Sequence, residues 1–287
     1  MLEGVRFMKR IISIIMVLIT TLSLCIFCAC SNKEGSTVDN SYDKVQSNGT
    51  LVMGLDDTFP PMGYTDTDTG KIIGFDVDLA TEVCNRLGIK LKLQPIDWQT
   101  KEMELNNGNV DCIWNGLSKT DFLDSALNLS KPYMKNNQCI LVKNDADYNS
   151  LTDLKGKIFC VQDQSSAEHA LDKNLVFKGS LASVVTPDSY KSAIMELENG
   201  TVDAIGIDEV VARFYMNNKP GAYRILENES GNILSLSIED YVIAFRKNDN
   251  ELKVKIEETL KQMADDGTLE IISKKWFEKD ITSVKEW

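Results

Sequence analysis

The chain contains one nine-residue sequence twice, as LNNGNVDCI at residues 105–113 and as LENGTVDAI at residues 197–205. Six of the nine positions are identical between the two copies. Each copy passes from a polar-faced helical segment through an Asn-Gly stop into an apolar strand. The repeat therefore predicts one supersecondary unit that is used twice, once in each of two similar lobes.

Helical and strand patterns alternate along the body, which predicts an α/β fold with parallel-rich sheets flanked by helices. In open parallel sheets a ligand lies beyond the carboxyl ends of the strands. Residues 114–118 and 206–208 follow the two copies of the repeat, so we expect both segments to face one cleft. The predicted strands are 50–55, 89–93, 157–161, 181–185, 202–207 and 241–246, and the predicted helices are 74–88, 165–174, 188–199 and 252–263.

The composition limits the classes of function. A length of 287 residues, with 43% hydrophobic and 26% charged residues, suits two ordinary globular domains. The net charge of -12 argues against a nucleic-acid partner. The sequence has one histidine and lacks the Walker A, GxGxxG, HExxH and GxSxG motifs. We therefore expect no cofactor, no metal site and no catalytic residues.

The first thirty residues differ from the body. Basic residues precede an uncharged apolar run at residues 11–29, and Cys30 follows, an order that predicts an export signal. Residues 27–30, Phe-Cys-Ala-Cys, resemble the cleavage site of a bacterial lipoprotein signal peptide, here residues 1–30, with a lipid on Cys30. An uncleaved transmembrane helix is the alternative, and both place the body outside the membrane. The polar residues 31–48 predict a flexible tether.

The body contains four isolated cysteines without CxxC spacing. Each falls among apolar residues in a helix or strand, where cysteine behaves as a small hydrophobic residue, so we expect buried thiols. Pairing of two of them is the alternative for an exported protein. They are Cys84, Cys112, Cys139 and Cys160.

A series of motifs in a fixed order covers the body: LVMGLDDTFPPMGY, GKIIGFDVDLATEV, NGNVDCIWNGLS, LSKPY, VQDQSSA, NGTVDAIGIDEV, YVIAFRKNDNEL and DGTLEIISKKWF. Their order and spacing are more specific than any one of them. Through these motifs the chain, from Gly49 to Phe277, resembles the polar amino-acid-binding family of bacterial solute-binding proteins, the extracytoplasmic receptors of ABC importers.

The resemblance implies a two-lobed periplasmic-binding-protein-like (type II) fold, in which two crossing strands join the lobes and the lobes close on a small ligand. Lobe 1 would comprise residues 49–133 plus 242–287, and lobe 2 residues 134–241. The resemblance also implies a monomeric receptor outside the cytoplasm. The lipid on Cys30 would anchor it to the cell membrane, where it delivers its ligand to an ABC permease.

The same resemblance assigns five ligand-binding residues to the first lobe. Phe59 matches the aromatic residue that stacks on the ligand side chain, and Trp98 lines the same pocket. Asp56 matches a position that often contacts the distal group of the ligand. Gly116 and Ser118 match groups that contact the α-carboxylate. For Phe59 and Trp98, ordinary packing in the core is the alternative.

Three further residues come from the second lobe. Ser165 and Ser166 would contact the α-carboxylate at a helix start, or would only cap that helix. Asp208 matches the acid that pairs with the α-ammonium group. A surface cap is the alternative for Asp208, but its equivalence to Gly116 in the repeat predicts a place in the cleft.

Two positions depart from the family pattern. Leu123 stands five residues after Ser118, where the family usually has an arginine that clamps the ligand carboxylate. Leucine cannot do this, and Lys119 is the candidate to compensate. Gln164 stands where the family commonly has a glycine. The glutamine side chain leaves less room for a ligand to approach the backbone closely.

The sequence therefore predicts a substrate-binding protein of an ABC importer, not an enzyme, that captures a small polar amino acid or a derivative. Leu123 motivates one alternative, a receptor for a cationic amine that lacks an α-carboxylate. The alternative of another class is an enzyme on the same fold that resembles cyclohexadienyl dehydratase. The missing arginine removes the substrate anchor that such an enzyme needs.

Overall fold

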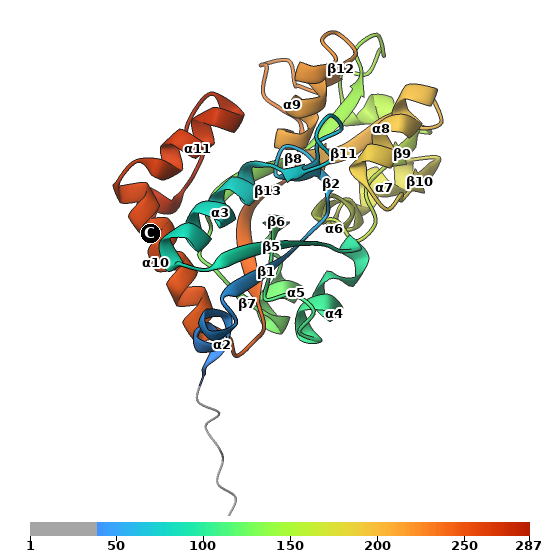
Figure 1. The fold of residues 1–287 in the computed structure, drawn as a ribbon. Helices are drawn as coiled ribbons and strands as arrows, with labels where there is room; N and C mark the ends of the chain where they lie inside the picture. Colours follow the sequence, from blue (N-terminus) through green and yellow to red (C-terminus); the bar gives the residue numbers. More distant parts are fainter. Residues whose placement is uncertain (1–38) are drawn as a thin grey trace, which may run out of the picture. The chain divides into compact units, whose positions relative to one another are not determined.

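A computed structural model describes the chain from Asp39 to Trp287 (Figure 1). The predicted signal peptide, Cys30 and the predicted tether at residues 31–38 lie outside the described residues. Within Asp39–Trp287, no helix combines the length and the apolar character that crossing a membrane requires.

The two copies of the repeat lead into the centres of two similar halves of one mixed sheet. In both halves, the strand after the repeat pairs in parallel with one neighbour and antiparallel with the other. The expected α/β architecture is thus confirmed, as a mixed sheet in which each half combines parallel and antiparallel pairs. In the first half the strand order is β5 (Lys90–Pro95), β1 (Thr50–Leu55), β6 (Cys112–Ser118) and β13 (Ser235–Phe245). In the second half it is β10 (Ser183–Val185), β9 (Ile158–Cys160), β11 (Ala204–Asp208) and β8 (Met134–Lys143).

The long strands β8 and β13 join the two halves. They pair antiparallel, from Met134 opposite Tyr241 to Cys139 opposite Ser235. Beyond this contact β8 continues along β11 and β12 (Tyr223–Ile225), and β13 continues along β6 and β7 (Asn128–Leu129). These are the two crossing strands of the type II fold. The division into lobes at 133/134 and 241/242 stays a prediction. The first boundary falls at the start of β8 and the second inside β13.

The aspartates that the two repeats share make the same contact in both halves. The Asp111 amide donates to the Val52 carbonyl at 2.7 Å, and Asp111 Oδ2 accepts the Val52 amide at 2.9 Å. Asp203 makes both bonds to Ile158, each 2.8 Å long. A backbone amide removed from water needs such an acceptor. The repeat therefore encodes the point at which each central strand enters its sheet.

Helices pack against both halves of the sheet. In the first half, α3 (Phe75–Leu87), α10 (Asn250–Asp265) and α11 (Thr268–Phe277) pack on one another, and in the second, α6 (Ser166–Lys173) and α8 (Tyr190–Asn199) pack on β11. Gly88 and Gly200 end α3 and α8 in the left-handed conformation, as glycine stops do. The chain also forms helices α4 (Lys101–Asn106), α5 (Asp121–Ala126), α7 (Leu175–Ser180) and α9 (Glu209–Asn218). The small strands β2 (Thr58–Phe59), β3 (Gly63–Thr65) and β4 (Ile72–Ile73) form a separate sheet.

The prediction of a flexible tether through residue 48 is wrong for its last part. Ser41–Asn48 forms helix α2, which packs on α10 with Ser41 and Val45 buried. Ser41 Oγ accepts the Leu252 amide at 3.1 Å, and Asp39 Oδ2 accepts the Glu251 amide at 2.7 Å. These groups serve unpaired amides at the start of α10. The sequence did not predict α2 because this helix buries only one apolar side chain, that of Val45, and makes polar contacts with residues far along the chain. Such a segment has no apolar periodicity.

The prediction of buried thiols is confirmed. Among the described residues, Cys84, Cys112, Cys139 and Cys160 are all buried, and none forms a disulfide with another. Burial raises the pKa of Cys84 and of Cys160 to about 12. At neutral pH these two cysteines are protonated, and they act as small packing residues.

The repeat aspartates make a testable contribution to stability. We expect Asp203→Ala to lower the free energy of unfolding by about 1–3 kcal/mol, because it leaves the partly buried Ile158 amide without its acceptor. Urea unfolding of the full chain measures this change. Glu229→Ala, at an exposed loop position, is the control and should stay within about 0.5 kcal/mol of the wild type. Equal stabilities for the two variants would contradict the role of the repeat.

Candidate functional site

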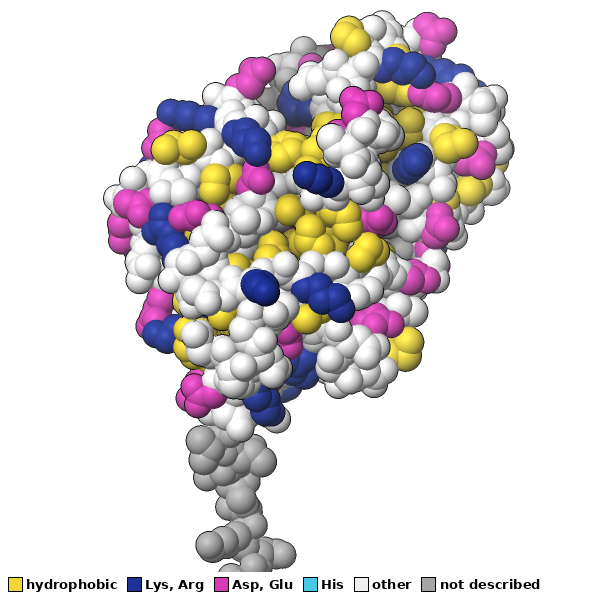
Figure 2. Space-filling model, in the orientation of Figure 1, with side chains coloured by type: hydrophobic (Ala, Val, Ile, Leu, Met, Phe, Trp, Pro, Cys, Tyr) yellow, Lys and Arg dark blue, Asp and Glu magenta, His cyan; other side chains and the backbone are white. Residues whose placement is uncertain are grey.

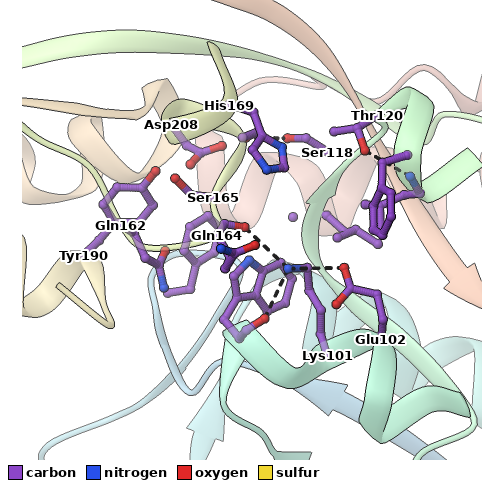
Figure 3. Close-up of a pocket in the computed structure, with 17 residues that line it drawn as sticks. Lys101, Glu102, Ser118, Thr120, Gln162, Gln164, Ser165, His169, Tyr190 and Asp208 are labelled. Atoms are coloured by element: carbon purple, nitrogen blue, oxygen red, sulfur yellow. Dashed lines mark hydrogen bonds and ion pairs between the residues drawn. The ribbon is translucent and has the colours of Figure 1, made fainter. Parts of the chain in front are cut away.

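A cavity of about 310 Å³ is lined by residues from both halves of the sheet, including the carboxyl ends of β6 and β11. On the face shown in Figure 2, hydrophobic side chains gather in the central hollow. Figure 3 shows polar side chains converging on the cavity. Its lining residues are Phe59, Trp98, Lys101, Glu102, Gly116, Leu117, Ser118, Thr120, Phe122, Leu123, Gln162, Gln164, Ser165, Ser166, His169, Tyr190 and Asp208.

Most of the predicted ligand-binding residues meet at this cavity. The structure brings together Phe59, Trp98, Gly116, Ser118, Ser165, Ser166 and Asp208, and leaves out only Asp56. Their contact with a ligand stays a prediction, but their common position follows from the strand ends at which the repeat places them.

Asp56 lies behind the cavity wall. Its Oδ1 accepts the amide and hydroxyl of Thr58 at 2.8 and 2.6 Å, and its Oδ2 accepts Gln162 Nε2 at 3.1 Å. Gln162 itself lines the cavity and is 1% exposed. Burial raises the pKa of Asp56, partly offset by these bonds. In this conformation Gln162, not Asp56, presents a polar group to the cavity.

Gly116 has a left-handed backbone and no room for a side chain. Its φ is +59°, and a Cβ atom there would lie 2.8 Å from Phe59 Cε1 and 3.2 Å from the Tyr241 ring. Its amide donates to Oδ2 of the fully buried Asp76 at 2.7 Å. Burial raises the pKa of Asp76 to about 7, although the hydrogen bonds from Gly116 and Tyr133 lower it. The Gly116 amide is thus already engaged inside the protein.

The aromatic residues divide between the cavity and the core. Phe59 and Trp98 line the cavity, and the Phe59 ring centre lies 5.8 Å from that of Tyr190. Trp114 is fully buried against Tyr133 and does not reach the cavity. Tyr190 was predicted only as part of a buried helix stripe, but it also lines the cavity. Its hydroxyl has no hydrogen-bond partner among the described residues.

Asp208 is the buried carboxylate of the cavity, with 3% exposure. It occupies the cap position before α9 but makes no side-chain cap, so the surface-cap alternative is wrong. Its Oδ1 accepts Asn136 Nδ2 at 2.6 Å, Gln138 Nε2 at 2.7 Å and the Tyr241 hydroxyl at 2.6 Å. All three bonds end at Oδ1, and the Tyr190 hydroxyl lies near enough to the carboxylate to lower the pKa of Asp208. All three donors belong to the crossing strands β8 and β13.

The environment of Asp208 favours its neutral form when no cation is near. Burial raises the pKa of Asp208 to about 7, and the negative charge of Glu239 raises it further, while the bonds from Tyr241 and Gln138 lower it. A buried carboxylate of this kind is stabilised in its charged form by a positive group. A positive group beside Asp208 would therefore favour the ionised carboxylate.

Serine hydroxyls from both halves meet across the cavity. Ser166 Oγ donates to Ser118 Oγ at 3.2 Å and accepts Gln138 Nε2 at 2.9 Å. Ser165 is the N-cap of α6, and its hydroxyl accepts the Glu168 amide at 3.2 Å. Capping thus occupies Ser165, while the hydroxyls of Ser118 and Ser166 bond only to other side chains.

The two departures from the family pattern have clear structural outcomes. Leu123 is 5% exposed and packs in an apolar cluster with Leu105 and Leu117. Gln164 has a φ of +56°, a left-handed conformation that favours glycine. Lys119 does not line the cavity; its half-exposed side chain pairs with Asp124 at 3.3 Å. The expected compensation from Lys119 is therefore not seen in this conformation.

Four cavity residues were not predicted from the sequence. Lys101 and Glu102 come from α4, and Gln162 and His169 come from the second half, so only the fold brings the two pairs together. Lys101 alone could have been noticed, since it stands one turn before Leu105 on the buried face of α4. Among the described residues, no group of three or more His, Cys, Asp and Glu side chains is placed to hold a metal ion.

Two lobes joined by two strands, with a buried carboxylate, serine hydroxyls and aromatic rings around an interlobe cavity, define a ligand-binding protein of the two-lobed type II class. Residues 51–279 match the bacterial extracellular solute-binding proteins, family 3. Because this match covers most of the chain, the chain belongs to that family.

Similar proteins carry names that refer to binding. The L-cystine-binding protein TcyA of Bacillus subtilis is 28% identical over 93% of this chain and 98% of its own length. An ABC uptake transporter substrate-binding protein from Streptococcus pneumoniae, crystallised with bound histidine, is 34% identical, with a TM-score of 0.80 over 86% of this chain and 100% of its own. A third is an ancestral amino-acid-binding protein described as a precursor of cyclohexadienyl dehydratase. It is 30% identical, with a TM-score of 0.73 over 82% of this chain and 98% of its own.

The close approach of Phe59 to Gly116 can be tested against a second left-handed glycine. Gly108 has a φ of +78° and open space around its Cβ position. Gly108→Ala should therefore lose only the left-handed preference, about 1–2 kcal/mol. Gly116→Ala should lose about 1–3 kcal/mol more, because the new methyl group overlaps the ring. Urea unfolding compares the two, and equal losses would show that Phe59 moves away freely.

Proposed function

We propose that this chain is the receptor of an ABC importer and that it captures a small amino acid in the interlobe cavity. Asp208 would bind the α-ammonium group through its free Oδ2. Ser118, Ser165, Ser166 and Gly116 would surround the α-carboxylate, and Phe59 and Trp98 would pack on the side chain. Asp56 would act through Gln162, which separates it from the cavity.

The observation that carries this proposal is the buried Asp208 carboxylate, which lines the cavity while three donors hold only its Oδ1. A charge-assisted bond to an ammonium group in a closed site is strong. The similar proteins support the same ligand class, since their names refer to L-cystine, histidine and amino acids.

A cationic amine without a carboxylate is the second candidate ligand. It is favoured by the apolar Leu123 side chain, which lines the cavity where a carboxylate clamp was expected. Asp208 and the rings of Phe59 and Trp98 could hold such a cation. Calorimetry with an amino acid and its decarboxylated amine separates the two ligands, and a preference for the amine would overturn the amino-acid proposal.

We propose no enzymatic activity for this cavity. One similar structure is described as a precursor of cyclohexadienyl dehydratase, so a related activity deserves a direct test. A dehydratase would need a general acid against an anchored substrate. Turnover of a cyclohexadienyl acid by the purified protein would contradict this part of the proposal.

The cellular setting is also a proposal. A lipid on Cys30 would anchor the receptor on the outer side of the membrane, where it would work as a monomer and pass its ligand to an ABC permease. The membership of an extracellular family supports the location. Mass spectrometry of the protein from membranes tests the lipid, and an unmodified Cys30 in the mature protein would exclude it.

A thermal-shift screen of amino acids, amines and small peptides is the experiment that tests the ligand class. A ligand that binds only the folded state raises the apparent stability by mass action. The proposal predicts that an amino acid gives the largest shift. The cavity of about 310 Å³ lies at the small end of the usual range for ligand sites, which favours small compounds over peptides.

The role of Asp208 predicts a loss of affinity on substitution. Asp208→Asn should weaken amino-acid binding by a factor of about 10–100, because the ammonium loses its charged partner. Asp121→Asn, which makes the same charge change at an exposed position of α5, is the control. Titration calorimetry measures both. Unchanged affinity of Asp208→Asn would exclude an ammonium site at Asp208.

The raised pKa of Asp208 also predicts a pH dependence. The folded protein keeps a proton on Asp208 up to about pH 7, whereas the unfolded chain releases it near 3.8, so the stability from this group is present at low pH and lost as the pH rises through 7. Binding has the opposite sign, since the ammonium needs the ionised acid. Affinity should therefore fall as the pH is lowered from 8 to 6, with Asp208→Asn removing most of the change.

A further inference from the structure

Lys101, the first residue of α4, is a buried cation in the cavity wall. The residue is 6% exposed and lines the cavity. Figure 3 shows its side chain rising into the cavity between Glu102 and Gln164, apart from Asp208 and Tyr190. Lysine is rarely buried without a partner, because removing an ammonium ion from water is costly.

The contacts of the Lys101 ammonium group leave room for a stronger partner. Nζ donates to the backbone carbonyls of Trp98 at 3.2 Å and of Gln164 at 3.4 Å, both long for such bonds. The nearest carboxylate among the described residues is that of Glu102, at 3.6 Å. Burial lowers the pKa of Lys101, although the negative charge of Glu102 raises it. A ligand carboxylate would complete this set of contacts.

Lys101 lines the same cavity as Leu123, the position that lacks a positive charge. Leu105 follows Lys101 by one helical turn, so both side chains share a face of α4. Leu105 packs in the same apolar cluster as Leu123, and Trp98 packs against that cluster. The Lys101 ammonium lies 5.1 Å from the centre of the Trp98 ring. A cation on this side of the cavity can serve a group that Leu123 cannot.

We propose that Lys101 binds the α-carboxylate of the ligand and thereby supplies the positive charge that Leu123 lacks. This inference rests on the proposed function and makes it more specific. The cavity then holds an anion site at Lys101 and a cation site at Asp208. It selects compounds that carry both charges and discriminates against amines that lack the carboxylate.

A second role for Lys101 has to be separated from this one. Lys101 belongs to the first half of the fold and Gln164 to the second, so their contact also links the two halves. A link of this kind would affect all ligands equally, whether or not they carry a carboxylate. The effect of a substitution on a pair of ligands therefore distinguishes binding of the carboxylate from a link between the halves.

The test is titration calorimetry on the full chain with two ligands, the best amino acid from the thermal-shift screen and its decarboxylated amine. The wild type should prefer the amino acid. Lys101→Met should weaken amino-acid binding by a factor of about 10–100 and leave amine binding unchanged, so that the preference disappears. Lys101→Arg keeps the charge and should keep most of the preference. Lys119→Met removes a half-exposed lysine outside the cavity and should behave as the wild type.

Three results would overturn the inference. A preference for the amino acid that survives Lys101→Met excludes Lys101 as the carboxylate partner. Equal weakening of both ligands assigns Lys101 only to the link between the halves. Binding of the amine alone by the wild type would overturn the proposed function and this inference together, and the wild-type measurement shows it without any variant. Melting temperatures of the unliganded variants establish that each one folds.

Discussion

The antiparallel pairing of β8 with β13 is the interaction on which the rest of the structure depends. Each strand belongs to both halves of the sheet, and each contributes donors to one oxygen of Asp208. The carboxylate that lines the cavity is therefore fixed by the connection between the lobes and not by one lobe alone. A change in the angle between the strands would disturb bonds to a buried charge, which is costly when no water replaces them.

Two buried acids hold the two strand ends that meet at the cavity. Asp76 accepts a hydrogen bond from the amide of Gly116, which lies near the end of β6. Asp208 is the last residue of β11, and its side chain lines the cavity. Burial raises the pKa of both to about 7. Each acid accepts hydrogen bonds through one oxygen, and Oδ1 of Asp76 has no hydrogen-bond partner among the described residues. The difference between the two acids is their position, since Asp76 is sealed in the core whereas Asp208 lines the cavity.

The sequence allowed the architecture to be predicted because periodicity and the repeat are local signals. Gly88 and Gly200 end helices where their conformational freedom predicts it, and the repeat aspartates mark strand entry. Contacts between distant segments could not be predicted in this way. Gln162 shields Asp56 across 106 positions of sequence, and the Gln164 carbonyl reaches Lys101 across 63. Neither pattern nor family motif carries information about such pairs.

The single free oxygen of Asp208 has a stereochemical consequence. In the proposed function it would offer a cation one direction of approach, while Phe59 and Ser118 line the same cavity. Three attachment points that are not in line distinguish a molecule from its mirror image. An amino acid bound as proposed, with its ammonium, carboxylate and side chain on three different groups of residues, would therefore be distinguished from its enantiomer.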